Sequence, residues 1–206
     1  MVDSADIPPS TPMDAWLDAL GQPTGAPGGG AASGVMIAAA AALMAMVAGY
    51  TTDDDRVSKS VDSLADRRSE ALRAVEDDGV ASAGFGAALA LADDDPERDE
   101  RVRDAAIDAA RSAARVGDVG VAMMPELRLL AASGNPHLAV DLAVAAEALR
   151  AGQSGASLNI RANVRIARAH GASGAPLDAL AETVARLTDA RRDVSRVVDE
   201  LSSRLD

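Results

Sequence analysis

The amino-acid sequence predicts an all-α protein, a bundle of long antiparallel helices in a single domain spanning residues 1–206. The length is sufficient for one domain with a substantial core. Apolar residues make up 48% of the chain and aromatic residues only 1%. A core of Ala, Val, Leu and Met with so few aromatics favours closely packed helices over sheets. Apolar side chains also recur at helical spacing, and no stretch reads as a convincing strand.

Start and stop signals divide the chain into helical segments. After a flexible arm over residues 1–10, we expect a short helix that has Ser10 or Thr11 as its cap and ends at Gly21. Pro12 is expected in the first turn of that helix and Pro96 in the first turn of a later one. The other helices are expected at about 31–51, 57–92, 96–133 with a bend near 117–120 or Pro125, 137–169 and 177–205.

The last of these segments has the clearest periodicity. Apolar residues alternate spacings of three and four, in the manner of a coiled-coil seam that Arg191 interrupts. Packing of this helix on the chain's own core is favoured, and a seam between molecules is the alternative. The seam consists of Leu177, Leu180, Val184, Leu187, Arg191, Val194, Val198, Leu201 and Leu205.

Charge and composition exclude several classes of function. The formal net charge of −12 predicts repulsion from nucleic acid and from anionic membranes. The absence of cysteine excludes disulfides, thiolate chemistry and cysteine-ligated zinc. Only His137 and His170 are available as imidazole ligands, so no metal is expected. The N-terminus carries acids where a signal peptide needs basic residues, which predicts a cytoplasmic protein.

The stretch "APGGGAASGVMIAAAAALMAMVAGYT" allows three interpretations. It is long enough to span a bilayer, but it consists mainly of Ala and Gly and no Lys or Arg flanks it. A nucleotide-binding loop requires a preceding strand and a following Lys, and neither is present. We therefore expect a buried central helix, preceded by Gly28, Gly29 and Gly30. The N–H groups of these glycines could meet an anionic or carbonyl group of a ligand. The alternative is that the glycines serve tight packing alone.

Three blocks of the sequence resemble the cyclodeaminase/cyclohydrolase family of folate enzymes. "LDALGQPTGAPGGGAASG" with "AALMAMVAGYT" is similar to a P-T-P-G-G-G-S segment followed by an Ala-rich helix. "AVEDDGVASAGF" resembles an acidic E-D-A-x-A-F segment and places Asp78 on its aspartate. "GNPHLAVDLAV" with "NIRANVRIA" resembles G-N-x-N-x-x-S-D and N-V-R-I-N. This last block places Asp141 on the aspartate, and Asn159, Arg161 and Asn163 on the terminal segment.

The resemblance implies an all-α bundle, usually a homodimer, that acts on a tetrahydrofolate derivative without a metal. It implies catalytic roles for Asp78 and Asp141 and substrate contacts for the three glycines and for Asn159, Arg161 and Asn163. The sequence departs from the family pattern in several places, and the family's T-P-G-G-G is T-G-A-P-G-G-G here. Ala31 and Val140 stand where the family has serines, His137 replaces the second asparagine of G-N-x-N, and Ser82 replaces the aromatic residue after the acidic pair.

The chemistry of such substrates suits these residue types. A carboxylate beside a methenyl bridge can stabilise the cation, orient water and accept its proton. A second carboxylate suits the amide and amino donors of a pterin ring. Arg161, Arg165 and Arg168 share one helical face and could meet a glutamate tail, although a solvated charged face is the favoured interpretation for them. Asp141 lies on a face of small residues, where a buried structural role is the alternative.

Helix geometry limits how these residues can combine. Asp141 and Asn159 are 18 residues apart, so one continuous helix separates them by about 27 Å. A single small site cannot hold both from one chain. We therefore expect two copies of this helix to pack antiparallel across a two-fold axis, so that Asp141 of one subunit approaches Asn159 and Asn163 of the other.

The sequence thus predicts hydrolysis of 5,10-methenyltetrahydrofolate to 10-formyltetrahydrofolate, or deamination of 5-formiminotetrahydrofolate. Composition and spacing do not choose between this hydrolase and this lyase reaction. A catalytically degenerate, folate-binding or purely structural relative is the alternative, because of Ala31, Val140 and Ser82. A general helical interaction module based on the last helix is the third class.

Overall fold

The computed structural model of the chain describes residues 12–23, 25–51 and 54–204. The regular structure in these ranges is helical, and they contain no strand. The elements are α1 (Met13–Leu20), α2 (Gly29–Gly49), α3 (Asp55–Leu89), α4 (Arg98–Ala122), α5 (Met124–Ser133), the 3₁₀ turn η1 (Pro136–Leu138), α6 (Ala139–Ala169) and α7 (Ala175–Ser202). The predicted all-α bundle is confirmed. The arm over 1–10, Thr11 and Leu205 lie outside the described residues.

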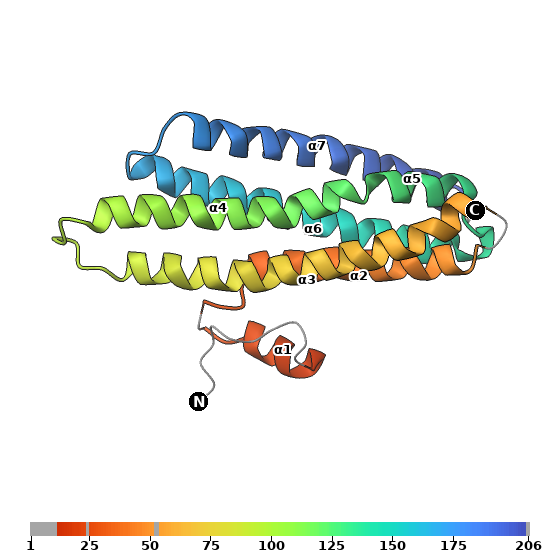
Figure 1. Cartoon of the computed structure of the whole chain (residues 1–206), viewed down its shortest axis with the longest axis horizontal. Coiled ribbons are helices and arrows are strands. Elements are labelled where there is room, and N and C mark those ends of the chain that lie inside the picture. The colour runs from red at the N-terminus through yellow and green to blue at the C-terminus, as the bar shows by residue number, and fades with distance from the viewer. Residues whose placement is uncertain (1–11, 24, 52–53, 205–206) are drawn as a thin grey trace.

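The long helices run lengthwise along one bundle, and short turns join most of them (Figure 1). Helix α2 packs between α3 and α6, α6 also contacts α4 and α7, and α3 contacts α4. In Figure 1, α2 begins near the middle of α3 and runs with α3 to the same end of the bundle, so its N-terminus lies well inside the length of the molecule.

Helix α2 is the central helix that the Ala-rich stretch predicts. By length and composition alone it could cross a membrane, with a mean hydropathy of 2.1, but 56% of that window is buried by its neighbours. Small residues let those neighbours approach closely. A Cβ added to Gly152 of α6 would lie 2.5 Å from Cγ1 of Ile37, and one added to Gly34 would lie 2.4 Å from Cγ2 of Val75.

The break between α4 and α5 falls at Met123, two residues before Pro125. Proline cannot donate the backbone hydrogen bond that a continuous helix needs there. The buried Gln153 of α6 supports the neighbouring turn, because its Nε2 donates to the carbonyl of Gly120 at 3.0 Å. The bend predicted near 117–120 or Pro125 is therefore found as a one-residue break at Met123 between two helices.

Both prolines expected inside first turns lie just outside their helices. Pro12 occupies the cap position of α1, and Pro96 comes two residues before the first residue of α4. The ring fixes the backbone for a helix but supplies no side-chain acceptor, so a proline can serve immediately before the first turn as well as within it. The expected end of α1 at Gly21 is confirmed.

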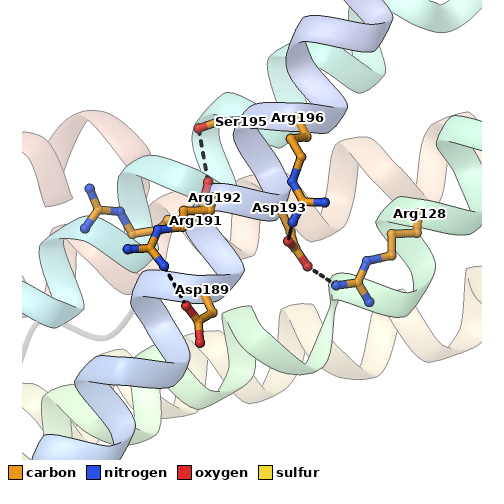
Figure 2. A network of polar contacts seen from close by, with 7 residues as sticks. All are labelled: Arg128, Asp189, Arg191, Arg192, Asp193, Ser195 and Arg196. Atoms are coloured by element: carbon orange, nitrogen blue, oxygen red, sulfur yellow. Dashed lines mark hydrogen bonds and ion pairs between the residues drawn. The ribbon is translucent and has the colours of Figure 1, made fainter.

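Helix α7 packs on α6 and α4 of its own chain, as the favoured interpretation of the Leu-rich seam expects. Leu177, Leu187 and Leu201 of that seam are buried. Polar contacts join the same helix to α5, where Asp193 bridges Arg128 of α5 and Arg196 one turn further along α7 (Figure 2).

Helix α1 lies beside the bundle (Figure 1), and Trp16 is its one buried residue. Trp16, the sole tryptophan of the sequence, is 3% exposed and packs with Ala31 of α2 and Val75 of α3. Its indole N–H is buried and has no hydrogen-bond partner among the described residues. The contact fixes α1 against the first turns of α2.

Candidate functional site

The glycine run forms the N-terminus of α2. Gly28 is the cap residue with an extended backbone, and its lack of a side chain leaves the helix without the usual cap. Gly29 lies beside Asn159 of α6, because an added Cβ would be 3.7 Å from its Nδ2. Gly30 lies against Asp78 of α3, because an added Cβ would be 2.2 Å from its Oδ2. Three helices therefore meet at this point.

Asp78 is a buried carboxyl group, with 6% of the residue exposed. It faces the N–H groups at the start of α2, where the helix dipole favours a negative charge. The absence of a Cβ at Gly30 makes this approach possible, since any other residue would occupy the volume of the carboxylate. This explains physically why the stretch opens with glycine rather than with alanine.

Burial raises the pKa of Asp78 above its ordinary value, because the charged form loses contact with water. The nearby Ser112 hydroxyl of α4, the N–H of Ala31, the charge of Arg115 and the Ser82 hydroxyl all lower the pKa and so act in the opposite direction. The net effect is a carboxyl group that holds its proton more strongly than an exposed aspartate. A raised pKa is a feature that buried carboxyl groups in acid–base catalysis share.

Asn159 is held by its own helix. The side-chain Nδ2 of Asn159 donates to the carbonyl of Gly155 at 2.9 Å. This hydrogen bond holds the side-chain amide beside Gly29. Ser33 of α2 donates to the Gly29 carbonyl at 2.7 Å and occupies the space that a Cβ on Gly155 would need. Asn163 is half-buried one turn further along α6. The glycines, Asp78 and Asn159, all of them predicted site residues, therefore lie together within one chain.

Asp141 lies at the opposite end of α6, in the first turn of the helix. Helix α6 is continuous from Ala139 to Ala169, so the separation of about 27 Å between Asp141 and Asn159 applies. The segment just before α6 lies beside the residues that follow α2, because the backbone N–H of Asn135 donates to the Thr51 hydroxyl at 2.9 Å. One subunit therefore does not bring its two predicted catalytic aspartates together.

Arg161 points to a different face of α6 from Asn159. It borders a groove of about 310 Å³ between α6 and α7 together with Arg165 and Arg168. Side chains two residues apart on an α-helix are separated by about 200° around the helix axis. Arg161 and Asn159 therefore cannot line one small site. The structure does not bring Arg161 to the predicted site.

Ser112 was not expected at the site, although it is fully buried beside Asp78. Its signal in the sequence is a single hydroxyl on the otherwise Ala- and Val-rich buried face of α4. Ser82, which replaces an aromatic residue of the family pattern, lies one turn beyond Asp78 on α3.

The two histidines lie elsewhere. His137 is exposed in η1, and His170 ends α6 and contacts Asp99 through Nδ1 at 2.7 Å. In the part of the chain that the structure describes, no group of three His, Asp or Glu side chains is arranged to hold a metal ion.

Comparison with known proteins places this helical bundle in a family. The family model described as formiminotransferase-cyclodeaminase matches residues 12–169, which include every helix from α1 to α6. The chain belongs to the formiminotransferase-cyclodeaminase family.

A solved structure has a similar fold. It is a formiminotetrahydrofolate cyclodeaminase from Thermotoga maritima, with a TM-score of 0.75 and 22% sequence identity. The match covers 92% of this chain and 96% of the Thermotoga protein, so the similarity includes α7. No curated protein matches the chain significantly.

Proposed function

We propose that the protein acts on a one-carbon unit carried by tetrahydrofolate, either hydrolysing 5,10-methenyltetrahydrofolate or deaminating 5-formiminotetrahydrofolate. The observation that carries the proposal is the buried Asp78 against the glycine N-terminus of α2, in a chain of this family. The name of the similar Thermotoga protein supports the deaminating reaction in particular.

Asp78 has the properties that either reaction needs. In the hydrolysis, water adds its oxygen to the carbon between two nitrogens and gives a proton to the carboxylate. One carbon–nitrogen bond then breaks, the released nitrogen takes up a proton, and a formyl group stays on the other nitrogen. In the deamination, the second nitrogen attacks the formimino carbon and gives up its own proton. The bond from that carbon to the formimino nitrogen then breaks, and this nitrogen takes up a proton and leaves as ammonia. In both, a carboxylate stabilises the cation that is spread over carbon and nitrogen.

A purely structural role for Asp78 is the second candidate. The carboxyl group accepts from the N–H of Ala31 and so caps a helix that has no side-chain cap of its own. A catalytically inactive relative would keep this contact for stability. The two roles differ in what they require, because a cap needs an acceptor oxygen and catalysis needs a titratable group.

Turnover by the purified protein tests the proposed function. We expect the absorbance of 5,10-methenyltetrahydrofolate to decay faster with the protein than in buffer, or ammonia to be released from 5-formiminotetrahydrofolate. Folate binding without turnover of either substrate would support the inactive relative instead. The absence of any folate binding would exclude both.

We further propose that the functional unit is a homodimer in the cytoplasm, formed through the shared outer face of α2 and α6. Helix α2 contains no charged residue, and its outer side presents Met46 and the following Tyr50. Val140, Val144 and Leu158 are exposed along α6, on the side next to α2. Antiparallel pairing of α6 through this face would carry Asp141 of the other copy toward Asn159.

A charge placed on this face is expected to separate the subunits. Val144→Glu would bury an unpaired carboxylate in the interface, which costs at least about 2 kcal/mol and weakens association at least about 30-fold. Analytical ultracentrifugation of the wild type and the variant measures the shift from dimer to monomer. Val80→Glu on α3 is the matched control, because Val80 is also an exposed valine but lies away from this face. A wild-type monomer that turns over folate at assay concentration would exclude the dimeric site.

The dimer also gives Asp141 a testable role. Asp141→Ala is expected to lower turnover without changing the folding of its own subunit, because its side chain is half-buried at the end of α6. Mixing Asp141→Ala with Asp78→Asn protein measures whether the two aspartates work across the interface. Sites that pair one intact Asp78 with one intact Asp141 form in the mixed dimers, so activity reappears if the roles cross between subunits.

A further inference from the structure

We propose that Ser112 and Ser82 are positioning residues for Asp78, whose carboxylate they hold by two hydroxyl groups. The proposal rests on the catalytic role proposed for Asp78. Neither serine is among the nearest neighbours of the glycine run, so both are assigned an effect through Asp78 rather than on a substrate.

The first observation is that, among the described residues, the hydroxyl groups of Ser112 and Ser82 do not donate to the backbone of their own helices. Serine within a helix commonly donates to the carbonyl four residues back, and this chain follows that habit at Ser33, Ser60 and Ser69. Neither Ser112 nor Ser82 forms such a bond among the described residues. Their hydroxyl groups therefore do not use the usual local acceptor.

The second observation is burial. Ser112 is fully buried, and its hydroxyl has no partner of good hydrogen-bond geometry in the part of the chain that is described. Leaving a buried hydroxyl unpaired costs about 1–3 kcal/mol. The hydroxyl hydrogen rotates freely to suit a nearby acceptor. Ser112 lies one turn before Arg115 on α4, and Nε of Arg115 is 3.8 Å from Oδ2 of Asp77, the residue before Asp78. The Ser112 hydroxyl and the Asp78 carboxyl therefore lie at the same level of the contact between α3 and α4.

The third observation is the convergence of separate elements on one carboxyl group. Ser82 follows Asp78 by one turn of α3, Ser112 comes from α4, and Ala31 comes from α2. A carboxylate that accepted from these three groups could not rotate freely, and one of its lone pairs would be fixed toward the site. Positioning of this kind is what a general base needs.

The charged groups near Asp78 come from few elements. Helix α4 contributes Arg115, which also lies 3.8 Å from Asp77 on α3. Glu76 is exposed on α3, and α2 contributes no charged side chain. On α6 the neighbour at this level is the uncharged Asn159. The two serines therefore act on Asp78 without a competing acid from α2 or α6.

Carboxyl NMR measures this directly and needs no activity. The protein is labelled with ¹³C at the aspartate carboxyl groups, and the Asp78 signal is assigned as the one that Asp78→Asn removes. We expect Ser112→Ala to raise the titration midpoint of Asp78, because the carboxylate loses a donor. Ser82→Ala is expected to raise it by less, since its effect on the carboxyl is the smaller one.

Ser60→Ala is the matched control, because Ser60 is a buried serine of α3 that donates to the Arg56 carbonyl at 3.1 Å. It should leave the midpoint unchanged. A midpoint in Ser112→Ala that equals that of Ser60→Ala would overturn the proposal. If Ser112→Ala does not fold, Ser112→Cys keeps the shape with a weaker donor and should give the same upward direction.

A second measurement separates this inference from the proposed function. If the protein turns over a folate substrate, the acid limb of the rate profile should move to higher pH in Ser112→Ala, with KM little changed. A shifted NMR midpoint without turnover in the wild type would keep the positioning role and remove the folate reaction. Turnover of a folate substrate, with an unshifted NMR midpoint and an unchanged rate profile in Ser112→Ala, would keep the folate reaction and remove the positioning role.

Discussion

Replacement of Asp78 by Asn is expected to lower turnover by about 10²–10⁴-fold while leaving the protein folded. The amide keeps an oxygen that can accept from the N–H of Ala31, so the start of α2 stays capped. It loses the group that takes up a proton. Steady-state kinetics with both folate substrates measure the loss, and Glu76→Gln, an exposed neighbour on α3, is the control. Full activity in Asp78→Asn would leave Asp78 with the structural role alone.

The same variant is expected to be more stable at neutral pH. Burial raises the pKa of Asp78 in the folded protein above the unfolded value of 3.8. The folded state therefore binds more protons between the two values, and its stability falls as pH rises through that window. The amide of the Asp78→Asn variant has no such titration. Thermal unfolding should show a higher Tm for the variant above the window, with the difference vanishing at low pH, and a rise of about 2–4 °C would correspond to roughly 1 kcal/mol.

The second large effect is expected at the contact between α2 and α6. In Gly152→Ala the new Cβ would lie 2.5 Å from Cγ1 of Ile37 and 2.8 Å from the backbone oxygen of Ser33. The backbone oxygen cannot move without shifting α2, so the two central helices must separate. Overpacking of this kind costs about 1–3 kcal/mol. Thermal unfolding should show a fall in Tm of about 2–12 °C, at about 2–4 °C for each kcal/mol.

Gly86→Ala gives the opposite sign and serves as the control. Gly86 lies near the end of α3, and nothing is within 4 Å of an added Cβ there. Alanine is favoured over glycine in a helix by up to about 1 kcal/mol. A Tm of Gly152→Ala equal to that of Gly86→Ala would show that α2 and α6 do not pack closely at Gly152.

Much of the fold follows from local signals in the sequence. The predicted helices over 31–51, 57–92 and 137–169 correspond to α2, α3 and α6 within a few residues. Long apolar periodicity and glycine or proline breaks are local properties, so a single sequence contains them. The first residues of the helices were harder to predict, as Pro12 and Pro96 show, because a proline suits both the last loop residue and the first turn.

The site was predictable only where helix geometry or the family resemblance supplied the missing contacts. The separation of Asp141 from Asn159 follows from the rise per residue once the helix is known. The grouping of Asn159 with Arg161 in one motif did not imply one site, since the two point to different faces of α6. Ser112 approaches Asp78 through packing of α4 on α3, and no spacing along the chain encodes that contact.

The place of Trp16 gives the molecule a spectroscopic probe of its own. It is the single indole in the sequence, it is nearly shielded from water, and it touches Ala31, the residue after Gly30. Any change in how α2 begins therefore alters the surroundings of the only strong fluorophore. Emission wavelength and quenching by iodide can follow events at the glycine run in real time, without a label, an assay or a known ligand.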